Sequence, residues 1–393
     1  MRQLPGRAAL MAGLVGLVAA AVALSGTPSA QAASRLSQTS NATYQTNGRV
    51  TDVLTVGGTT YLAGEFTSVR PPGAPAGSRT VPRAHLAAVN STTGALLPWN
   101  PKADRPVYTL AASPDGNTIY AGGNFTQVGG QPRKHLAAMT AGGGTVTGFR
   151  ADTVGQVKAL AVSAGRVYLG GTFTSVDGQP RSRLAAVTTA GALVSTWRPA
   201  ANDTVRVLAL SPDGGSVYAG GEFGAINGAS AQKNLVKLSA SGGGVQAWAS
   251  HPGYPVSALV VTPTRVYVGG DGSGGHAGSY SPGGVRGWVT QTDGGVQAIA
   301  LLDGVLYIGG HFDKVCVGDT AGGTSGFQCP STKAVRHKLV AVDAQTGGTD
   351  GWNPGANSSL GVYGLAAVGG RLHVGGAFTV LGGRAQQGYG SFS

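Results

Sequence analysis

The chain has 393 residues, of which 68 are glycine, about 17% against a background near 7%. A hydrophobic content of 41% is too high for a disordered chain, and the glycines lack the three-residue period of collagen. Because glycine is costly inside helices, a mainly helical protein is also excluded. What remains is an all-β, turn-rich globular protein with a net charge of +12 and enough residues for a full core.

The first 32 residues have the features of a signal peptide. Arg2 and Arg7 precede an uncharged apolar stretch at 8–24, and Ala30-Gln31-Ala32 is a small-residue cleavage signal. An uncleaved membrane anchor is the alternative, although roughly 17 apolar residues are short for a span. Cleavage leaves 393 − 32 = 361 residues with a charge of +12 − 2 = +10. We therefore expect a secreted protein in which residues 33–393 form a single domain.

A seven-fold internal repeat dominates the remaining sequence. Its clearest phrase is Tyr-x-Gly-Gly-x-Phe, and successive copies start at Tyr61, Tyr120, Tyr168, Tyr218, Tyr267, Tyr307 and His373. Each unit of about 50 residues contains four short strand signals separated by turn residues; in the second unit these signals lie at 107–112, 118–125, 135–139 and 146–149. Four strands per unit predict the blades of a seven-bladed β-propeller rather than a helical solenoid.

An aromatic residue closes each unit except the last. These residues are Trp99, Phe149, Trp197, Trp248, Trp288 and Trp352, whereas the seventh unit stops at Ser393 after its third strand. The segment before the first unit has the phase of the missing strand. We therefore expect residues around 36–47 to supply the outer strand of the last blade and to close the ring, which protects an otherwise exposed sheet edge.

The two cysteines, Cys316 and Cys329, lie close together in one loop-like stretch with 12 residues between them. An exported protein favours a disulfide between them, whereas this spacing is a weak pattern for a metal site. No sequence pattern indicates a metal or any other cofactor.

The repeat resembles a known family. The pattern Y-x-G-G-x-F-T-x-V-x-G-x-x-R-x-x-L-A-A, followed by Thr-Gly and a Trp-containing strand, is similar to the delta-60-type β-propeller repeats of secreted bacterial proteins, over residues 44–393. The fifth unit departs from it, since its Phe is missing and its middle loop is almost absent. In architecture and secretion the chain also resembles the lectin-like propellers of umbrella-type antibacterial toxin particles of actinobacteria. That likeness implies a targeting subunit.

Residues that suggest catalysis fit the scaffold better. Glu65 and Glu222 are the only glutamates, and a carboxylate pair could serve glycoside hydrolysis. However, both occupy one repeat position, three blades apart, where other units carry Asn124 or Thr172. His85 and His135 also recur at one repeat position. Because no catalytic motif is present, we expect a protein that is not an enzyme.

The predicted binding face is basic. Between the second and third strands of the units lie basic residues that we take as the ligand-binding face: Arg70, Arg79, Lys134, Arg183, Arg336, Lys338 and Arg384. All except Arg336 are interpreted as falling outside the repeat. Arg336 matches Arg83, Arg133 and Arg181, for which bonds to blade carbonyls are the favoured role. Two of these loops are also expanded, and variable loops on a rigid scaffold are where binding function concentrates.

The leading hypothesis is a secreted, non-enzymatic module that binds a cell-surface glycan or cell-wall polymer, alone or with other protein subunits. A protein–protein scaffold without glycan affinity is the alternative, and a propeller hydrolase or lyase is the third. We expect no nucleic-acid partner, because the positive charge is spread thinly over the chain, and no membrane insertion.

Overall fold

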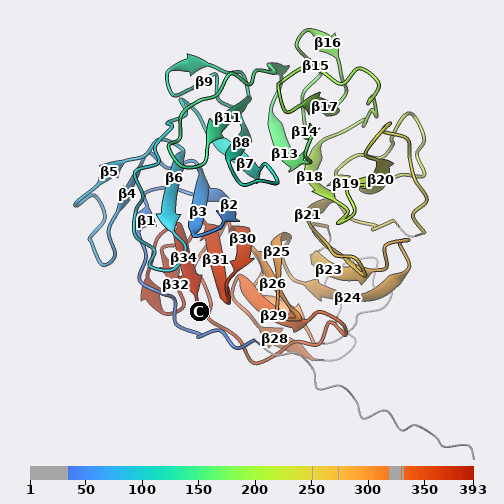
Figure 1. Cartoon of the computed structure of the whole chain (residues 1–393). Helices are drawn as coiled ribbons and strands as arrows, with labels where there is room; N and C mark the ends of the chain where they lie inside the picture. The colour runs from blue at the N-terminus through green and yellow to red at the C-terminus, as the bar shows by residue number, and fades with distance from the viewer. Residues whose placement is uncertain (1–33, 250, 273, 318–328, 330–331) are drawn as a thin grey trace, which may run out of the picture. The chain divides into compact units, whose positions relative to one another are not determined.

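The computed structural model describes residues 34–249, 251–272, 274–317, 329 and 332–393 (Figure 1). Every regular element in these ranges is a β-strand, so the all-β prediction is confirmed for them. The predicted signal peptide at 1–32 lies outside the described residues. Among those described, no helix is long and apolar enough to cross a membrane.

Each copy of the repeat forms an antiparallel sheet in which the first strand of the copy pairs with the second, and the second pairs with the third. We call the first strand of each sheet its inner strand. In chain order, six of these sheets are β2 (Val50–Val56), β3 (Thr59–Gly64) and β6 (Leu86–Asn90); β7 (Val107–Ala112), β8 (Thr118–Gly123) and β11 (Leu136–Thr140); β13 (Val157–Val162), β14 (Arg166–Gly171) and β17 (Leu184–Thr188); β18 (Val205–Leu210), β19 (Ser216–Gly221) and β20 (Leu235–Ser239); β25 (Val296–Leu302), β26 (Val305–Gly310) and β29 (Leu339–Asp343); and β30 (Val362–Val368), β31 (Arg371–Gly376) and β34 (Tyr389–Phe392).

The fifth repeat forms the sheet with the most complete fourth strand. Its strands are β21 (Val256–Val261), β22 (Val266–Gly270), β23 (Gly275–Tyr280) and β24 (Arg286–Thr292). In the first four sheets and the sixth, the predicted fourth strand is reduced to a single bridge, such as Val89 with Leu96. The repeat that departs most from the sequence pattern is therefore a full four-stranded sheet.

Short accessory strands lie in the loops between the second and third strands, and two more, at 45–46 and 153–154, precede the first strand of their repeat. They are β4 (Ser68–Arg70) and β5 (Val81–Pro82), which pair with β1 (Gln45–Thr46); β9 (Gln127–Val128) and β10 (Gln131–Pro132); β12 (Thr153–Val154), β15 (Ser175–Val176) and β16 (Gln179–Pro180); β27 (Lys314–Cys316) and β28 (Lys333–Val335); and β32 (Val380–Leu381) and β33 (Arg384–Ala385). The predicted disulfide between Cys316 and Cys329 is confirmed, and it joins the end of β27 to the following loop.

The first glycine of the Gly-Gly pair brings neighbouring sheets into close contact. A Cβ atom added to Gly220 at the end of β19 would lie 2.5 Å from Val256 Cγ1, at the start of the next inner strand. The same relation links Gly170 to Val205 and Gly309 to Val362. Only glycine allows the backbone to approach the valine so closely.

The aromatic residues tie each sheet to the next. The ring of Tyr61 packs edge-on against that of Trp99 at 5.0 Å, and the Trp99 indole N–H donates to the carbonyl of Thr140 in the following sheet. Trp197 donates in the same way to Ser239. Trp99 and Trp197 thereby link their own sheets to the sheets that follow.

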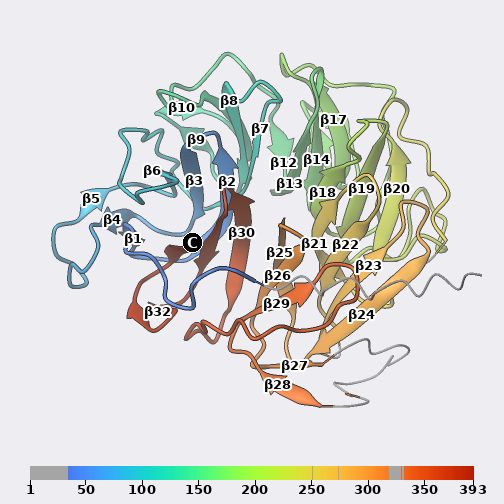
Figure 2. The same cartoon turned by 60° about the horizontal axis from the view of Figure 1, so that its bottom comes forward.

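The two ends of the described chain meet. The inner strand β30 of the last sheet contacts β2 of the first, and a Cβ atom on Gly375 would lie 2.6 Å from Val50 Cγ1 (Figures 1 and 2). Asn41 forms a bridge with Ser391 in β34, and the N–H of Ser37 donates to the carbonyl of Ser393. Residues 37–41 therefore run alongside the outer edge of the last sheet.

Candidate functional site

Three residues of the predicted basic face are already engaged by the protein. The Arg70 guanidinium is buried and donates to the Ala74 carbonyl and to the side chains of Gln45 and Gln387. Arg336 donates to two backbone carbonyls, as Arg83 and Arg133 do in their own sheets. The Lys338 ammonium is buried and lies 2.7 Å from Asp313 Oδ1.

Arg183 and Lys338 follow the repeat after all, contrary to the sequence interpretation. They occupy the position directly before the third strand, where other sheets carry His85 and His135, and all four residues have a left-handed backbone with φ between 63° and 67°. A residue with this conformation is set by the turn into the strand. Arg79, Lys134 and Arg384 are exposed, and Arg183 is half-buried. These four belong to different repeats.

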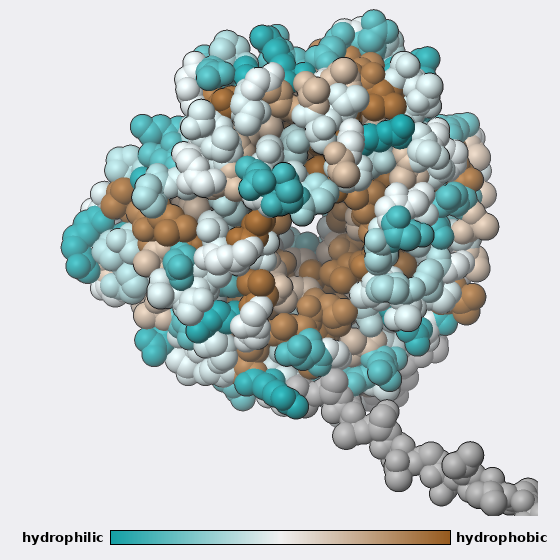
Figure 3. Space-filling model, viewed as in Figure 1, coloured by the Kyte–Doolittle hydropathy of each residue, from teal (hydrophilic) through white to brown (hydrophobic). Residues whose placement is uncertain are grey.

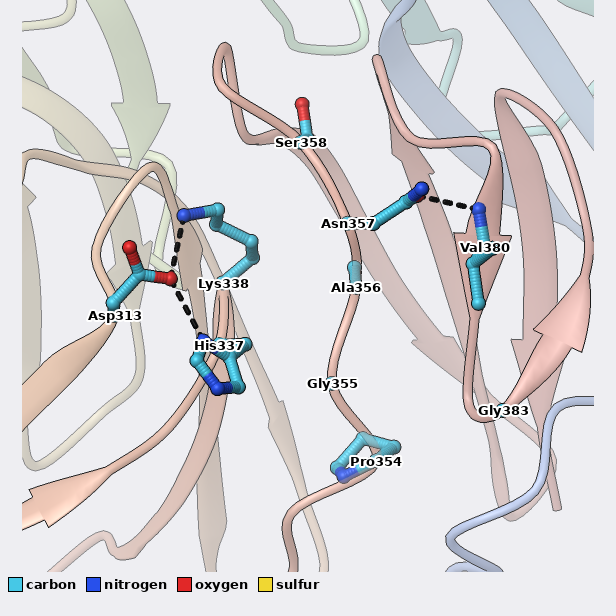
Figure 4. A pocket seen from close by; sticks show the side chains of 10 residues that line it. All are labelled: Asp313, His337, Lys338, Pro354, Gly355, Ala356, Asn357, Ser358, Val380 and Gly383. Atoms are coloured by element: carbon cyan, nitrogen blue, oxygen red, sulfur yellow. Dashed lines mark hydrogen bonds and ion pairs between the residues drawn. The ribbon is translucent and has the colours of Figure 1, made fainter.

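One pocket on the predicted face includes a predicted residue. It is a hollow of about 420 Å³ lined by Lys338, His337 and Asp313 on one side and by residues 354–358 on the other (Figure 4). The Asp313 carboxylate accepts from both His337 Nδ1, at 2.9 Å, and Lys338 Nζ. These contacts hold the pKa of Asp313 below its usual range. The charged groups here neutralise one another.

A second site, which sequence reasoning missed, lies along the inner strands. Each inner strand carries a β-bulge at its second residue, directly after a fully buried valine, in the same register in all seven sheets. The seven extra residues are Thr51, Tyr108, Lys158, Arg206, Ser257, Gln297 and Tyr363. All seven are half-buried. Bulges re-aim side chains and occur beside functional sites.

Six of these bulge residues line one pocket of about 250 Å³, which we call the bulge pocket. They are Thr51, Tyr108, Lys158, Arg206, Ser257 and Tyr363, joined at the wall by Asp52 and apolar strand residues. The second glycine of each Gly-Gly pair makes room for the bulge, because a Cβ on Gly221 or Gly171 would collide with the carbonyl before the inner strand. The face viewed in Figure 1 is also hollowed among the sheets, with hydrophobic surface along the rim (Figure 3).

Arginines neutralise the carboxylates near the bulge pocket. Arg206 forms ion pairs with both Glu222 and Asp271, at 2.6 Å for Asp271, and also donates to the Ser257 hydroxyl at 3.1 Å. Arg49 pairs with Glu65 at 2.5 Å. One carboxylate oxygen of each glutamate thus accepts from a guanidinium group. Each glutamate therefore pairs with an arginine of its own repeat, in the first and the fourth sheet respectively.

Aromatic rings and a buried acid complete the pocket. The Arg49 guanidinium lies 4.8 Å from the centre of the Tyr363 ring and donates to its hydroxyl, and the Lys158 ammonium lies 5.3 Å from the centre of the Tyr108 ring. Asp52 accepts backbone N–H groups from Val53 and from Leu110 in the next sheet. Burial raises the pKa of the Asp52 carboxyl to about 6. Within the described ranges no group of His, Cys, Asp and Glu side chains is arranged to hold a metal.

The comparisons with known proteins support the fold and leave the activity open. The model of a family described as "Domain of unknown function (DUF5122) beta-propeller" matches residues 165–193. This supports a β-propeller repeat family. No curated protein matches the chain. Among solved structures, the crystal structure of the computationally designed Ika8 protein is similar, with 13% identity and a TM-score of 0.54 over 89% of this chain and 98% of that one.

Proposed function

We propose that the protein is a secreted, non-enzymatic binding module that recognises carbohydrate on a cell surface or cell wall. In this proposal the seven sheets are the blades of one closed propeller, and residues around 36–47 complete the last blade. Contacts between successive inner strands and between β30 and β2 support the ring. The Cys316–Cys329 disulfide supports export, because disulfides persist in oxidising compartments.

The bulge pocket is the observation that carries the binding function. In each of the seven repeats a β-bulge presents one side chain. These seven side chains differ in chemistry, and six of the side chains line one pocket. A scaffold alone does not require hydroxyl, ammonium, guanidinium and phenol groups at equivalent positions. Tyrosine, serine and charged side chains that converge in a largely preformed hollow are typical of sites for small polar ligands.

The paired carboxylates favour binding over hydrolysis. Glu222 and Asp271 both contact Arg206, and Glu65 contacts Arg49. Hydrolysis of a glycoside by two carboxyl groups needs one of them free to donate a proton to the leaving oxygen. With one oxygen of each carboxylate held by an arginine, these groups are suited to fixing the guanidinium groups in place for a ligand.

A glycan and cell-wall array tests the proposal. The mature protein is compared with three variants: Tyr108→Ala in the bulge pocket, Arg79/Lys134/Arg183→Gln on the loops, and the exposed control Lys233→Gln. We expect the wild type and the control to bind a defined set of glycans, and Tyr108→Ala to lose at least ten-fold in affinity.

The other outcomes each have a meaning. Loss only in the triple variant would transfer the site to the basic loops and overturn the bulge pocket as the binding site. Absence of glycan binding, with a defined protein recovered from culture supernatant, would replace the carbohydrate proposal by a protein scaffold. Release of products from a bound glycan would overturn the non-enzymatic function.

A further inference from the structure

Lys158 places an ammonium group in the bulge pocket without a counter-ion. Its side chain is half-buried and lines the pocket beside Tyr108 and Arg206. Among the residues that the structure describes, its ammonium makes no hydrogen bond or ion pair, and its neighbour is the face of the Tyr108 ring. The other two cations beside the pocket, Arg49 and Arg206, each have carboxylate partners.

The surroundings do not balance the charge of Lys158. Burial is the main cause that lowers the pKa of the Lys158 ammonium, and the positive charge of Arg206 lowers it further, by more than Glu222 raises it. Glu222 and Asp271 are paired with Arg206, and the Asp52 carboxyl in the pocket wall accepts two backbone N–H groups, so none of these three acids forms an ion pair with Lys158. A partly dehydrated cation in this position is stabilised when an anion enters the pocket.

The pocket limits the size of that anion. At about 250 Å³ it is smaller than the range of roughly 300–1,000 Å³ typical of sites for drug-sized ligands. It can therefore hold one small unit rather than a chain. The wall offers hydroxyl groups from Thr51, Ser257 and Tyr108. The Thr51 hydroxyl already donates to the Val107 carbonyl, and the Ser257 hydroxyl accepts from Arg206 and donates to Asp271.

We propose that the bulge pocket binds a single carboxylate-bearing sugar unit, such as a uronic acid, and that Lys158 pairs with its carboxylate. The inference rests on the proposed carbohydrate-binding function and narrows its ligand class. The lysine supplies charge and up to three N–H donors, while the hydroxyl of Tyr108, which lines the same pocket, can bond a hydroxyl group of the ring. A phosphate or sulfate ester of a sugar is also negatively charged, so the titrations below include a sugar phosphate.

The test compares glucuronate with glucose, which differ at one carbon that carries either a carboxylate or a hydroxymethyl group. Calorimetric titration of the full mature protein at pH 7 and low salt gives both affinities. We expect glucuronate to bind at least ten-fold more tightly than glucose, and more tightly than acetate or glucose 6-phosphate. Equal affinities for glucose and glucuronate would overturn the inference without any variant, and so would tighter binding of the phosphate.

Variants then assign the effect to one residue. Lys158→Gln removes the charge and is expected to reduce the glucuronate preference at least ten-fold. Lys158→Arg keeps the charge and should retain most of it. Lys233→Gln, a matched loss of one exposed lysine elsewhere, should change nothing. A preference that survives in a folded Lys158→Gln protein would overturn the assignment.

Failure of the inference can be told apart from failure of the proposed function. If the array shows binding to neutral glycans that Lys158→Gln retains, the carbohydrate function stands and the uronic-acid inference falls. If no glycan binds but simple carboxylates bind in a Lys158-dependent way, the pocket is an anion site and the carbohydrate function falls.

Discussion

At the scale of single residues, His373 shows how one repeat position changes its chemistry. The other six repeats carry tyrosine there, whereas the His373 imidazole is fully buried. Its Nδ1 lies 2.8 Å from the hydroxyl of Tyr389 and faces Thr60 in the first sheet. Burial, with a smaller contribution from Arg371, lowers the pKa of His373 to about 4, so the imidazole is neutral near pH 7.

This buried imidazole predicts a loss of stability in acid. As pH falls below 6.5, His373 becomes protonated in the unfolded chain, whereas in the folded protein it stays neutral until about pH 4. The stability contribution is therefore intact above pH 6.5 and is lost by up to about 3 kcal/mol as pH falls to 4. In His373→Gln the free energy of unfolding, from urea titrations across this range, should fall less steeply. An identical slope in variant and wild type would contradict the assignment.

At the scale of elements, the Gly-Gly pair performs two separate tasks. The first glycine faces the valine of the next inner strand, as Gly220 faces Val256, and the second clears space for the bulge, as Gly221 does before Arg206. The glycine-rich composition thus both packs the sheets together and creates the positions that line the bulge pocket. In the first repeat alanine, Ala63, takes the place of the first glycine, and only Gly64 is kept.

Substitution of Gly220 tests the packing task. In Gly220→Ala the new Cβ would lie 2.5 Å from Val256 Cγ1 and 2.8 Å from Val207 Cγ1, so both strands must shift. We expect a cost of about 1–3 kcal/mol, typical of overpacking, and a lower Tm in a thermal melt. Gly242→Ala in the turn of the same repeat is the control, because no atom lies within 4 Å of its added Cβ. Equal melting of the two variants would refute the close-packing role.

At the scale of the whole molecule, the N-terminal segment holds the last sheet. Leu36 packs in a cluster with Trp352 and Phe392, and the Trp352 indole N–H donates to the carbonyl of Ser37. In other repeats, such as that of Trp197, the acceptor is a carbonyl of the next sheet. For Trp352, Ser37 of the N-terminal segment thus takes the place that the next sheet takes for Trp197.

Removing this segment should destabilise the protein far more than trimming a frayed terminus. Deletion of residues 33–47 uncovers Trp352 and the edge of β34, so we expect a large drop in Tm. A milder variant, Leu36→Asn, should destabilise by about 2–4 kcal/mol because it buries an amide in an apolar cluster. Gln38→Asn, at an exposed neighbour, is the control. A melt unchanged by the deletion would rule out the structural role.

Much of the fold could be predicted from residues that recur in sequence. The positions of the strands follow from alternating apolar residues and turn glycines, and the disulfide follows from two cysteines close together in a chain predicted to be exported. The fourth strands could not be predicted well. Their pairing is reduced to one bridge, such as that between Leu238 and Val245. The length of this pairing depends on contacts between segments that the pattern of apolar residues does not specify.

The candidate site was harder to predict, because its residues share no chemical type. Thr51, Lys158 and Tyr363 look unrelated along the chain, and their only common signal is the position after the valine that begins each inner strand. We predicted a ligand-binding face from basic loop residues because their charge can be read directly from the sequence. Arg70 and Lys338 are nevertheless buried, since carbonyl or carboxylate partners from distant segments surround them.

The sequence by itself determined the repeat, the all-β class and the glycine positions, because these depend on local periodicity and backbone freedom. Only the tertiary structure decided which side chains meet. A bulge turns one residue per inner strand toward its counterparts in other repeats, and the resulting pocket depends on contacts across hundreds of residues. No local pattern encodes the distance between Lys158 and Tyr108, or the two carboxylates that hold Arg206.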